Sequence, residues 1–572
     1  MILQALTKLY ENLAEQGKIA RPGWSKAKIS YALCINEKGE LEQIVPLLDG
    51  SGGKKPQPQQ FNLPTPVKRT VSIEPNFLWD NSSYLLGVDK KGKPERSKQC
   101  FIAAKKLHHD ILSNVDTPAA RSILCFFDRW APENEEKNLA SVPNSEGATS
   151  GANLLFRING IYAQEDKQIQ EAWQNYYDLS DGEKHQCLVT GINDEIVAVH
   201  PAIKGVDGAQ SSGAAIVSFN APAFCSYGQE QNFNAPVGKH AAFAYTSALN
   251  YLLADRENVQ KIGDTTVVCW AEDAEPQYQT FTFAALFGNR DGSADENDVR
   301  DAVRKLAAGQ PLPEQKLDPK EPFYILGLSP NAARISIRFF YRNTFGEIMR
   351  NVNAHHERME IVRPSYDRYA TIPLWAMLRE TINPKTRDKT PNPLMAGATA
   401  RAIFSGERYP AALLEQTMLR IRAEREITRG KAAMIKAYYL RNPNDDCPKE
   451  VLTVALNEES SNPAYTLGRL FSVFEAVQQA ANPGINTTIK DKYFNSAAST
   501  PATIFPLLNN LCQKHLRKLS AGSRIWYEKQ IIALMGILGE SYPTRLNLPQ
   551  QGSFNLGYYH QTQKRYEKKE EK

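Results

Sequence analysis

One stretch, residues 200–253, constrains the fold of this chain more than any other. It begins with a loop of small residues at 204–213, continues through a short apolar run at 214–219 and enters a second polar loop. Pro236 then precedes a segment with helical apolar spacing. Glycines in the first loop permit positive φ and a close approach of the backbone to a neighbour. We therefore predict a loop, a strand, a loop and a helix, in this order.

The polar side chains of these two loops are candidates for contact with nucleic acid. Hydroxyls and amides with few carboxylates among them can donate hydrogen bonds to phosphate oxygens and base edges without strong repulsion of the anion. The alternative is that they cap the elements that follow a buried turn. The candidates are Lys204, Gln210, Ser211, Ser212, Asn220 and Asn234.

Short motifs of this stretch form one long pattern, which consists of Gly208 and residues 211–214, 217–220, 223–224, 226–228, 234–236 and 242–246. In this pattern the stretch resembles the large subunit of the type I-C CRISPR Cascade surveillance complex. Further segments resemble the same family, at residues 328–334, 464–471, 488–494 and 556–561. The resemblance covers nearly the whole chain, except for residues 50–68 and 131–152.

The resemblance implies a non-catalytic subunit without a cofactor. Such a subunit recognises the protospacer-adjacent motif, a short tag in duplex DNA beside the target, and supports strand opening and R-loop formation. Guide pairing then supplies the long sequence specificity. The implied partners are CRISPR RNA, target double-stranded DNA, the backbone and guide-capping Cascade subunits, a helicase–nuclease that docks after target binding, and a small subunit. In this family the small subunit is commonly made from an internal start, for which Met434 is the candidate here.

The composition of the chain limits its class. At 572 residues it is too long for one core, so two to four domains are expected. The net charge is only +5, so a nucleic-acid surface must be local. The eight cysteines form no CxxC pair, which argues against a zinc knuckle and is typical of a reducing, cytoplasmic setting. No apolar run approaches the about 20 residues of a membrane span.

The distribution of strand and helix patterns predicts an α+β fold. We expect a mixed α/β N-terminal region with antiparallel strands at residues 1–381, followed by a linker and a long basic helix at 382–445. Helical patterns punctuated by glycine and proline then predict an α-helical bundle at residues 446–572.

Two N-terminal loops are further candidates for contact with DNA. Residues 50–68 are rich in Gly, Pro and Gln and are predicted to be a long loop, either disordered or lying along DNA. In the second loop, at 81–98, a polar turn precedes a lysine-rich turn. The resemblance implies that the N-terminal region reads the tag, and we place this reader at residues 81–98 and 204–234. The alternative for Asn81 is a structural role on a tight turn, where asparagine can take the left-handed backbone conformation. The candidate residues of the second loop are Asn81, Ser82, Ser83, Lys90 and Lys91.

Residues 333–342 alternate as a strand with one charged face. Ile335, Ile337, Phe339 and Tyr341 are predicted to share one face, and Arg334, Arg338 and Arg342 the other. Consecutive arginines would lie about 13 Å apart along the strand, a spacing suited to successive backbone phosphates. The alternative is a solvated charged face.

The run His108, His109 and Asp110 permits a different function, a metal-dependent nuclease. Adjacent residues of a helix do not share a face, however. Because a catalytic metal needs three or more converging ligands, we hold this as the alternative hypothesis.

Overall fold

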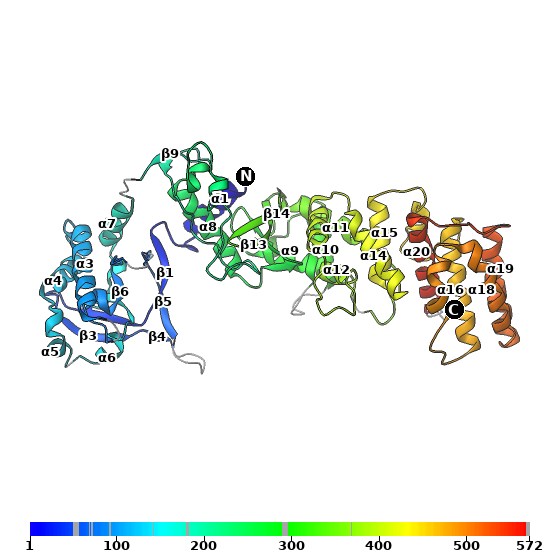
Figure 1. The fold of residues 1–572 in the computed structure, drawn as a ribbon, viewed down its shortest axis with the longest axis horizontal. Coiled ribbons are helices and arrows are strands. Elements are labelled where there is room, and N and C mark those ends of the chain that lie inside the picture. Colours follow the sequence, from blue (N-terminus) through cyan, green and yellow to red (C-terminus); the bar gives the residue numbers. More distant parts are fainter. Residues whose placement is uncertain are drawn as a thin grey trace. The chain divides into compact units, whose positions relative to one another are not determined.

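The computed structural model describes residues 1–49, 57–67, 69, 72–90, 93–140, 142–178, 182–288, 296–367 and 369–567. The chain divides into two units, which are coloured along the sequence in Figure 1. Unit 1 contains Met1 and residues 3–201 and 219–248. Unit 2 contains Ile2 and residues 202–218 and 249–572. The division differs from the predicted boundary at residue 382, since residues 249–381 belong with the C-terminal helices.

The main sheet of unit 1 has the strand order β3-β2-β7-β6, with β8 paired to β7. Strands β2 and β7 are parallel, and the other pairs are antiparallel. A smaller sheet has the order β1-β5-β4, and β9 pairs with β10. The strands are β1 (Trp24–Ile29), β2 (Tyr31–Ile35), β3 (Leu41–Pro46), β4 (Leu48–Asp49), β5 (Gln57–Pro64), β6 (Trp79–Asn81), β7 (Asn153–Ile158), β8 (Ile161–Tyr162), β9 (Lys184–Gln186) and β10 (Asn193–Glu195).

Strand β7 is buried on both faces because consecutive side chains of a strand point in opposite directions. Leu154 and Phe156 join one hydrophobic cluster, and Leu155 joins another. The helices and short 3-10 turns of unit 1 are α1 (Ile2–Glu15), α2 (Ser82–Leu85), α3 (Pro94–Leu112), α4 (Pro118–Arg129), η1 (Pro132–Asn134), α5 (Glu135–Leu139), α6 (Ser145–Ala148), η2 (Ala163–Glu165), α7 (Lys167–Asp178), η3 (Pro222–Phe224), η4 (Gln231–Asn234) and α8 (Lys239–Ala254), whose last turns belong to unit 2.

The sheet of unit 2 is antiparallel, in the order β11-β12-β13-β14. Its strands are β11 (Gln260–Ile262), β12 (Thr265–Ala271), β13 (Pro322–Asn331) and β14 (Arg334–Thr344). The helices and 3-10 turns that follow are α9 (Gln277–Phe287), α10 (Glu296–Ala307), η5 (Pro313–Gln315), α11 (Phe345–Met359), α12 (Leu374–Arg379), α13 (Pro393–Ser405), α14 (Ala411–Glu424), α15 (Arg429–Arg441), η6 (Lys449–Val451), α16 (Pro463–Ala481), α17 (Ile489–Ala497), α18 (Pro501–Leu516), α19 (Ala521–Leu538) and α20 (Leu548–Lys564).

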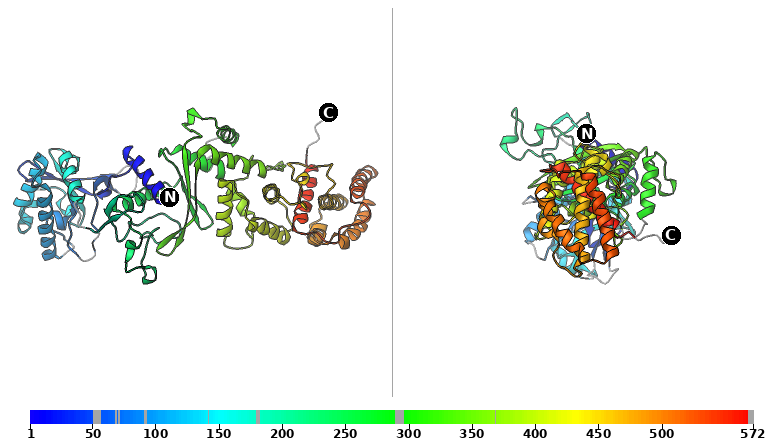
Figure 2. Two further views of the ribbon diagram at one scale, coloured as in Figure 1. Left: turned by 90° about the horizontal axis from the view of Figure 1, so that it is seen from above. Right: turned by 90° about the vertical axis from the view of Figure 1, so that its right-hand side faces the viewer.

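Helices α16 and α20 lie side by side in the C-terminal part of unit 2 (Figure 2). Their backbones touch at two glycines, since a Cβ on Gly468 would lie 1.9 Å from the Phe554 carbonyl oxygen and one on Gly557 would lie 2.0 Å from the Tyr465 carbonyl oxygen. The only residue that permits so close an approach is glycine. These glycines lie in two of the segments that carry the family resemblance.

The predicted α+β class is confirmed, because antiparallel sheets precede a run of C-terminal helices. Several local predictions were wrong. Residues 57–64 are not a loop but strand β5, which pairs with β1 and β4; residues 50–56 and 68 lie outside the described residues. Residues 131–152, which the resemblance does not cover, are part of the fold, because Leu139, Val142 and Ala148 join the core of unit 1.

The long basic helix predicted within residues 382–445 is not one helix but two. Helix α14 ends where Arg425 adopts a left-handed backbone conformation (φ 55°), and α15 begins after the capping residue Thr428. The predicted strand at residues 214–219 is reduced to two isolated bridges, at Ala214 and Ala215.

Candidate nucleic-acid interface

The loop at residues 202–218 is fixed to unit 2 by its main chain. Asn250 of α8 accepts from the Lys204 backbone N–H (2.8 Å) and donates to the Ala202 carbonyl oxygen (3.0 Å). The Thr266 hydroxyl accepts from the Asp207 backbone N–H at 3.1 Å. Glycine is required at position 213 of the loop (φ 102°), because a Cβ there would lie 2.8 Å from the Ala202 Cβ. The loop is therefore preorganised by side chains of the neighbouring helix and strand.

Four predicted contact residues of this loop are exposed, namely Lys204, Gln210, Ser211 and Ser212. The loop also reaches the start of β14. There the Ala215 backbone N–H donates to the Ala333 carbonyl oxygen (3.1 Å), and the Ala215 carbonyl oxygen accepts from the Ile335 N–H (2.9 Å). This pairing places the loop beside Arg334, whose backbone forms a parallel bridge with Ala215. The structure thus brings Arg334 and the first polar loop together.

The three arginines of β14 do not share one face, contrary to the prediction. The register pairs Gly327 with Phe339 but Leu328 with Ile337, so Arg338 is an extra, bulged residue. Gly327 lies beneath the Phe339 ring, which a Cβ would approach to 2.6 Å. Because one inserted residue reverses the alternation of side chains, Arg334 and Arg342 project from opposite faces.

The environments of Arg338 and Arg342 also differ from the predicted row of phosphate contacts. Arg338 donates to the Asp264 carboxylate (2.7 Å), which also accepts from the Ser329 hydroxyl (2.9 Å). These donors lower the pKa of Asp264, although desolvation opposes them as the largest single effect. The charge of Arg338 is therefore already compensated. Arg342 is exposed, and its guanidinium lies 5.5 Å from the centre of the Tyr324 ring.

The turn at residues 81–83 has a clear structural role. Asn81 caps α2, because its side-chain oxygen accepts from the Ser83 N–H at 3.0 Å. Ser82 is fully buried, so its hydroxyl cannot reach DNA in this structure. Ser83 is half-buried and donates toward Asp89 (3.4 Å). Asn81 therefore has a structural role as a helix cap, although its extended backbone (φ −75°) is not the left-handed conformation that the turn alternative expected.

The lysine-rich turn that follows is described only in part. Lys90 is exposed, with its ammonium 3.7 Å from the Glu146 carboxylate in an open ion pair. Exposed pairs of this kind contribute little and are easily exchanged for a phosphate. Lys91 lies outside the described residues.

The second polar loop, residues 219–236 of unit 1, is organised around Asn234. Its side-chain oxygen accepts from the Ser226 N–H (2.7 Å), and its amide donates to the carbonyl oxygens of Gln229 and Gln231 (both 2.9 Å). The predicted contact residue Asn234 is thus occupied in holding the loop, whereas Asn220 is exposed.

Tyr227, at the tip of this loop, was not among the predicted contact residues. Tyr227 and Gly228 both have positive φ (52° and 74°), and the Ser226 carbonyl oxygen accepts from the Gln229 N–H at 2.9 Å. The turn leaves the Tyr227 side chain fully exposed, at 103% of its reference area. A large aromatic ring that is exposed to solvent on a hydrogen-bonded loop offers a surface on which a base can stack. The Tyr-Gly pair next to Ser226 was the available signal.

The histidine–aspartate run does not form a metal site. Fully buried His108 accepts from the Leu78 N–H at Nε2 (3.0 Å), and its Nδ1 lies 2.7 Å from the Ala104 carbonyl oxygen. Both ring nitrogens are therefore occupied. His109 pairs instead with Asp128 (3.0 Å), and Asp110 is exposed. Within the described ranges no three His, Cys, Asp or Glu side chains converge in a way that could hold a metal.

No helix among the described residues is long and apolar enough to span a bilayer. No curated protein matches the chain. A model of the family described as CRISPR-associated protein (Cas_Csd1) matches residues 6–566. This match includes the polar loops, the bulged sheet and the glycine contact of α16 and α20. The chain therefore belongs to the Cas_Csd1 family of CRISPR-associated proteins.

Proposed function

We propose that this protein is the large subunit of a type I-C CRISPR RNA-guided Cascade complex and that it recognises the protospacer-adjacent motif in duplex DNA. In this role it supports strand opening and R-loop formation without catalysing a reaction itself. Family membership over residues 6–566 supports a place in a CRISPR complex. Guide pairing reads the long target sequence, which leaves a few base pairs and the DNA shape to the protein.

The observation that carries this proposal is the preorganised loop at residues 202–218. Its backbone is anchored to α8, β12 and β14, while the side chains of Lys204, Gln210, Ser211 and Ser212 are exposed. Rigid presentation of amides and hydroxyls favours base reading, because geometry is fixed before DNA arrives. The neighbouring lysine adds phosphate attraction that does not depend on base sequence.

In unit 1, we propose that Asn220, Ser83 and Lys90 add contacts and that Tyr227 stacks on an exposed base. Asn81 and Asn234 then act by holding their turns in place, and Ser82 contacts no DNA. This assignment follows the hydrogen bonds already made by the two asparagines.

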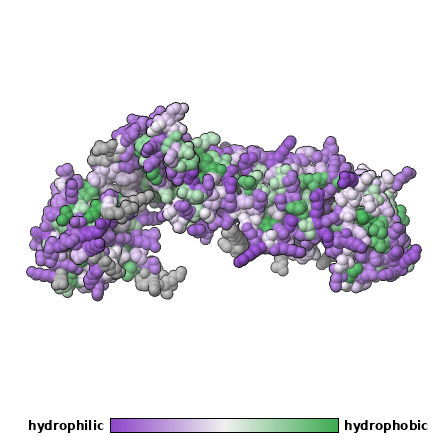
Figure 3. Space-filling view, in the orientation of Figure 1, coloured by the Kyte–Doolittle hydropathy of each residue, from purple (hydrophilic) through white to green (hydrophobic). Residues whose placement is uncertain are grey.

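The proposed partners are the backbone and guide-capping subunits, a small subunit and the helicase–nuclease. Helix α19 offers a surface for such an assembly, because apolar side chains on one of its faces are exposed, including Ile532 at 69%. Figure 3 shows hydrophobic surface over the C-terminal helices at the right of the view. Exposed apolar patches commonly mark protein interfaces.

We also propose Met434 as the internal start of the small subunit. Met434 lies within α15 and is buried at 1% exposure, so the shorter product would begin with the second half of that helix. It would contain α16–α20 with the glycine contact intact.

The proposal is tested with a guide-loaded complex and a duplex library randomised beside the target. Replacing Gln210, Ser211 and Ser212 together with Ala should reduce discrimination among tags, by about 1–3 kcal/mol for each lost base contact. Lys204→Gln should instead weaken all duplexes alike and reduce the salt slope by about 0.9. Gln513→Ala, an exposed glutamine of α18, is the control. Tag selection that is unchanged in the triple variant would overturn this assignment of the reader.

A further inference from the structure

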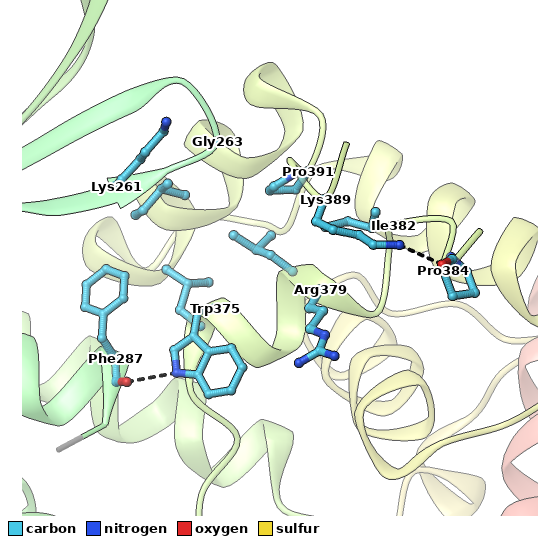
Figure 4. A pocket seen from close by; sticks show the side chains of 12 residues that line it. Lys261, Gly263, Phe287, Trp375, Arg379, Ile382, Pro384, Lys389 and Pro391 are labelled. Atoms are coloured by element: carbon cyan, nitrogen blue, oxygen red, sulfur yellow. Dashed lines mark hydrogen bonds between the residues drawn. The ribbon is translucent and has the colours of Figure 1, made fainter. Parts of the chain in front are cut away.

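A cavity of about 520 Å³ lies in unit 2. It is formed by the β11–β12 turn, the end of α9, helix α12 and the segment at residues 382–391 (Figure 4). Its volume is within the range of about 300–1,000 Å³ that is typical of small-molecule and cofactor sites. Four separate segments therefore build one site large enough for a ligand with a ring.

Helix α12 presents two different faces at this cavity. Leu374 and Leu378 are buried and belong to the core of unit 2, so they fix the helix in place. Trp375 and Arg379 are exposed and lie one turn apart on the cavity side (Figure 4). Residues at positions i and i+4 of a helix are neighbours on its surface.

The indole ring of Trp375 is fixed in orientation and offers an exposed aromatic surface. Its indole N–H donates to the Phe287 carbonyl oxygen at 3.1 Å, while half of the side chain is exposed (50%). The hydrogen bond satisfies the only polar atom of the ring and restricts its orientation. The remaining exposed surface is the ring itself, so stacking by a planar ligand would require little reorganisation.

The charge of the cavity is positive. Among the described residues, its lining includes Arg379, Lys389 and Lys261 and no carboxylate. Lys261 forms an ion pair with Asp207 and is therefore already compensated. Lys389 donates to the Pro384 carbonyl oxygen (2.6 Å), which is neutral and leaves the ammonium charge in place. Within the described part of the chain Arg379 and Lys389 form no ion pair with a carboxylate, so both lining residues keep an uncompensated positive charge.

We propose that this cavity binds one unpaired nucleotide of a single-stranded nucleic acid, with its base on Trp375 and its phosphate at Arg379 and Lys389. A nucleotide combines a planar ring with an adjacent anion, which matches the two features of the site. Single-strand sites in proteins join stacking on aromatic rings to cationic contacts with the backbone. A paired base cannot stack in this way, so a closed duplex does not fit. The inference deepens the proposed function, because strand opening would supply such a nucleotide.

The test measures the affinity of the full-length protein for a fluorescein-labelled ten-nucleotide oligothymidine by anisotropy. Trp375→Ala should weaken binding roughly 5- to 150-fold, the loss associated with one stacked base. Arg379→Gln should also weaken binding and should flatten its salt dependence. The matched controls are Trp526→Ala, since Trp526 is equally exposed (51%) on α19, and Arg387→Gln, since Arg387 is exposed in the 382–391 segment but does not line the cavity.

A second measurement guards against misfolding of the variants. Photocrosslinking of the wild-type protein to an oligonucleotide with 5-iodouracil should place the crosslink on Trp375 or Phe287. Equal affinity of wild type and Trp375→Ala, together with crosslinks elsewhere, would overturn the proposal. Thymidine monophosphate that binds as tightly as the oligonucleotide would identify a free nucleotide as the ligand and would also overturn it.

The two proposals can fail separately. Tag discrimination by the guide-loaded complex depends on residues 204–213, and Trp375→Ala should leave this discrimination unchanged. If Trp375→Ala weakens binding to a closed duplex as much as binding to the single strand, the site does not select an unpaired nucleotide.

Discussion

At the scale of single residues, polar side chains at the predicted interface divide into those that hold loops and those that are free to meet a ligand. Asn81 and Asn234 use their side chains within their own turns, whereas Gln210, Ser211 and Ser212 are exposed. Residue type alone does not separate these roles, because a hydrogen bond to a nearby backbone group and one to a base edge require the same atoms.

The capping role of Asn81 is tested by two substitutions. Asn81→Ala should destabilise the protein by about 0.5–2 kcal/mol, because the Ser83 N–H loses its acceptor. Asn81→Ser should retain most of the stability, since a hydroxyl also caps a helix, although it lacks the amide. Urea unfolding measures both effects. Loss of tag discrimination in the stable Ser variant would show instead that the amide reads a base.

Buried His108 makes stability depend on pH. Burial lowers its pKa to about 4, whereas the pKa of an unfolded histidine is about 6.5. Between these values the unfolded state binds more protons than the folded state. The contribution of His108 to the free energy of unfolding is therefore complete above about pH 6.5 and is lost as the pH falls toward 4, by up to about 3 kcal/mol. Urea unfolding at pH 7, 6 and 5 measures this loss.

The control for this prediction must separate His108 from other buried histidines. The pKa values of His200, His356 and His560 are also lowered to about 4, chiefly by burial. His108→Gln should therefore reduce the slope of stability against pH without removing it. The same slope in wild type and His108→Gln would contradict the assigned burial effect.

At the scale of elements, the sequence predicted where many strands and helices form, but it did not predict several places where they are interrupted. Period-two alternation correctly predicted β14, yet it could not reveal the bulge at Arg338, because the inserted residue is itself polar and exposed. The break between α14 and α15 occurs at Arg425, where neither glycine nor proline signals an end. Strand β5 forms in a Gln- and Pro-rich segment because β1 and β4 supply its hydrogen bonds.

The close contact between α16 and α20 predicts that alanine changes stability in opposite directions at a glycine within the contact and at one outside it. Gly468→Ala should destabilise the protein by about 1–3 kcal/mol or more, because the new methyl group would overlap the Phe554 carbonyl oxygen. A Cβ at Gly536 on α19 would have no described atom within 4 Å, so Gly536→Ala should stabilise its helix by up to about 1 kcal/mol. Thermal unfolding compares the two. An equal effect at both glycines would argue against close packing of these helices.

A ladder of side-chain hydrogen bonds accompanies this glycine contact. Tyr558 donates to Glu475 (2.5 Å), and the Arg469 guanidinium donates to Gln561 (3.1 Å). The buried Tyr465 hydroxyl and the His560 Nδ1 are 2.9 Å apart. Such buried polar groups are costly unless they are paired. The sequence motifs at 464–471 and 556–561 are therefore explained by one interface between two helices.

At the scale of the whole molecule, the family and the α+β class could be predicted from the sequence, whereas the division into units could not. The boundary falls near residues 201 and 249 because the loop at 202–218 packs with the unit 2 sheet rather than with its sequence neighbours. Contacts between residues so distant in the chain leave no local pattern. The cavity beside Trp375 was missed for the same reason, since four separate segments build it.

The exposed face of α19 predicts how the protein assembles. Ile532→Glu should leave the stability of the isolated chain nearly unchanged, because Ile532 is 69% exposed, but should weaken binding to the other complex subunits. Lys514→Glu, which changes the charge at an exposed position of α18, is the control. Co-purification of the subunits measures assembly. Full assembly of the Ile532→Glu variant would exclude this face as an interface.

The central claim, that the loop at 204–213 contacts the tag, is tested most directly by site-specific photocrosslinking. A benzophenone amino acid replaces Ser211 in one complex and the exposed Gln513 in another, and each complex is irradiated on a tagged target duplex. We expect a crosslink from position 211 to the tag bases and none there from position 513. Crosslinks from position 211 that fall only on other subunits, or that fall on DNA regardless of the tag, would contradict it.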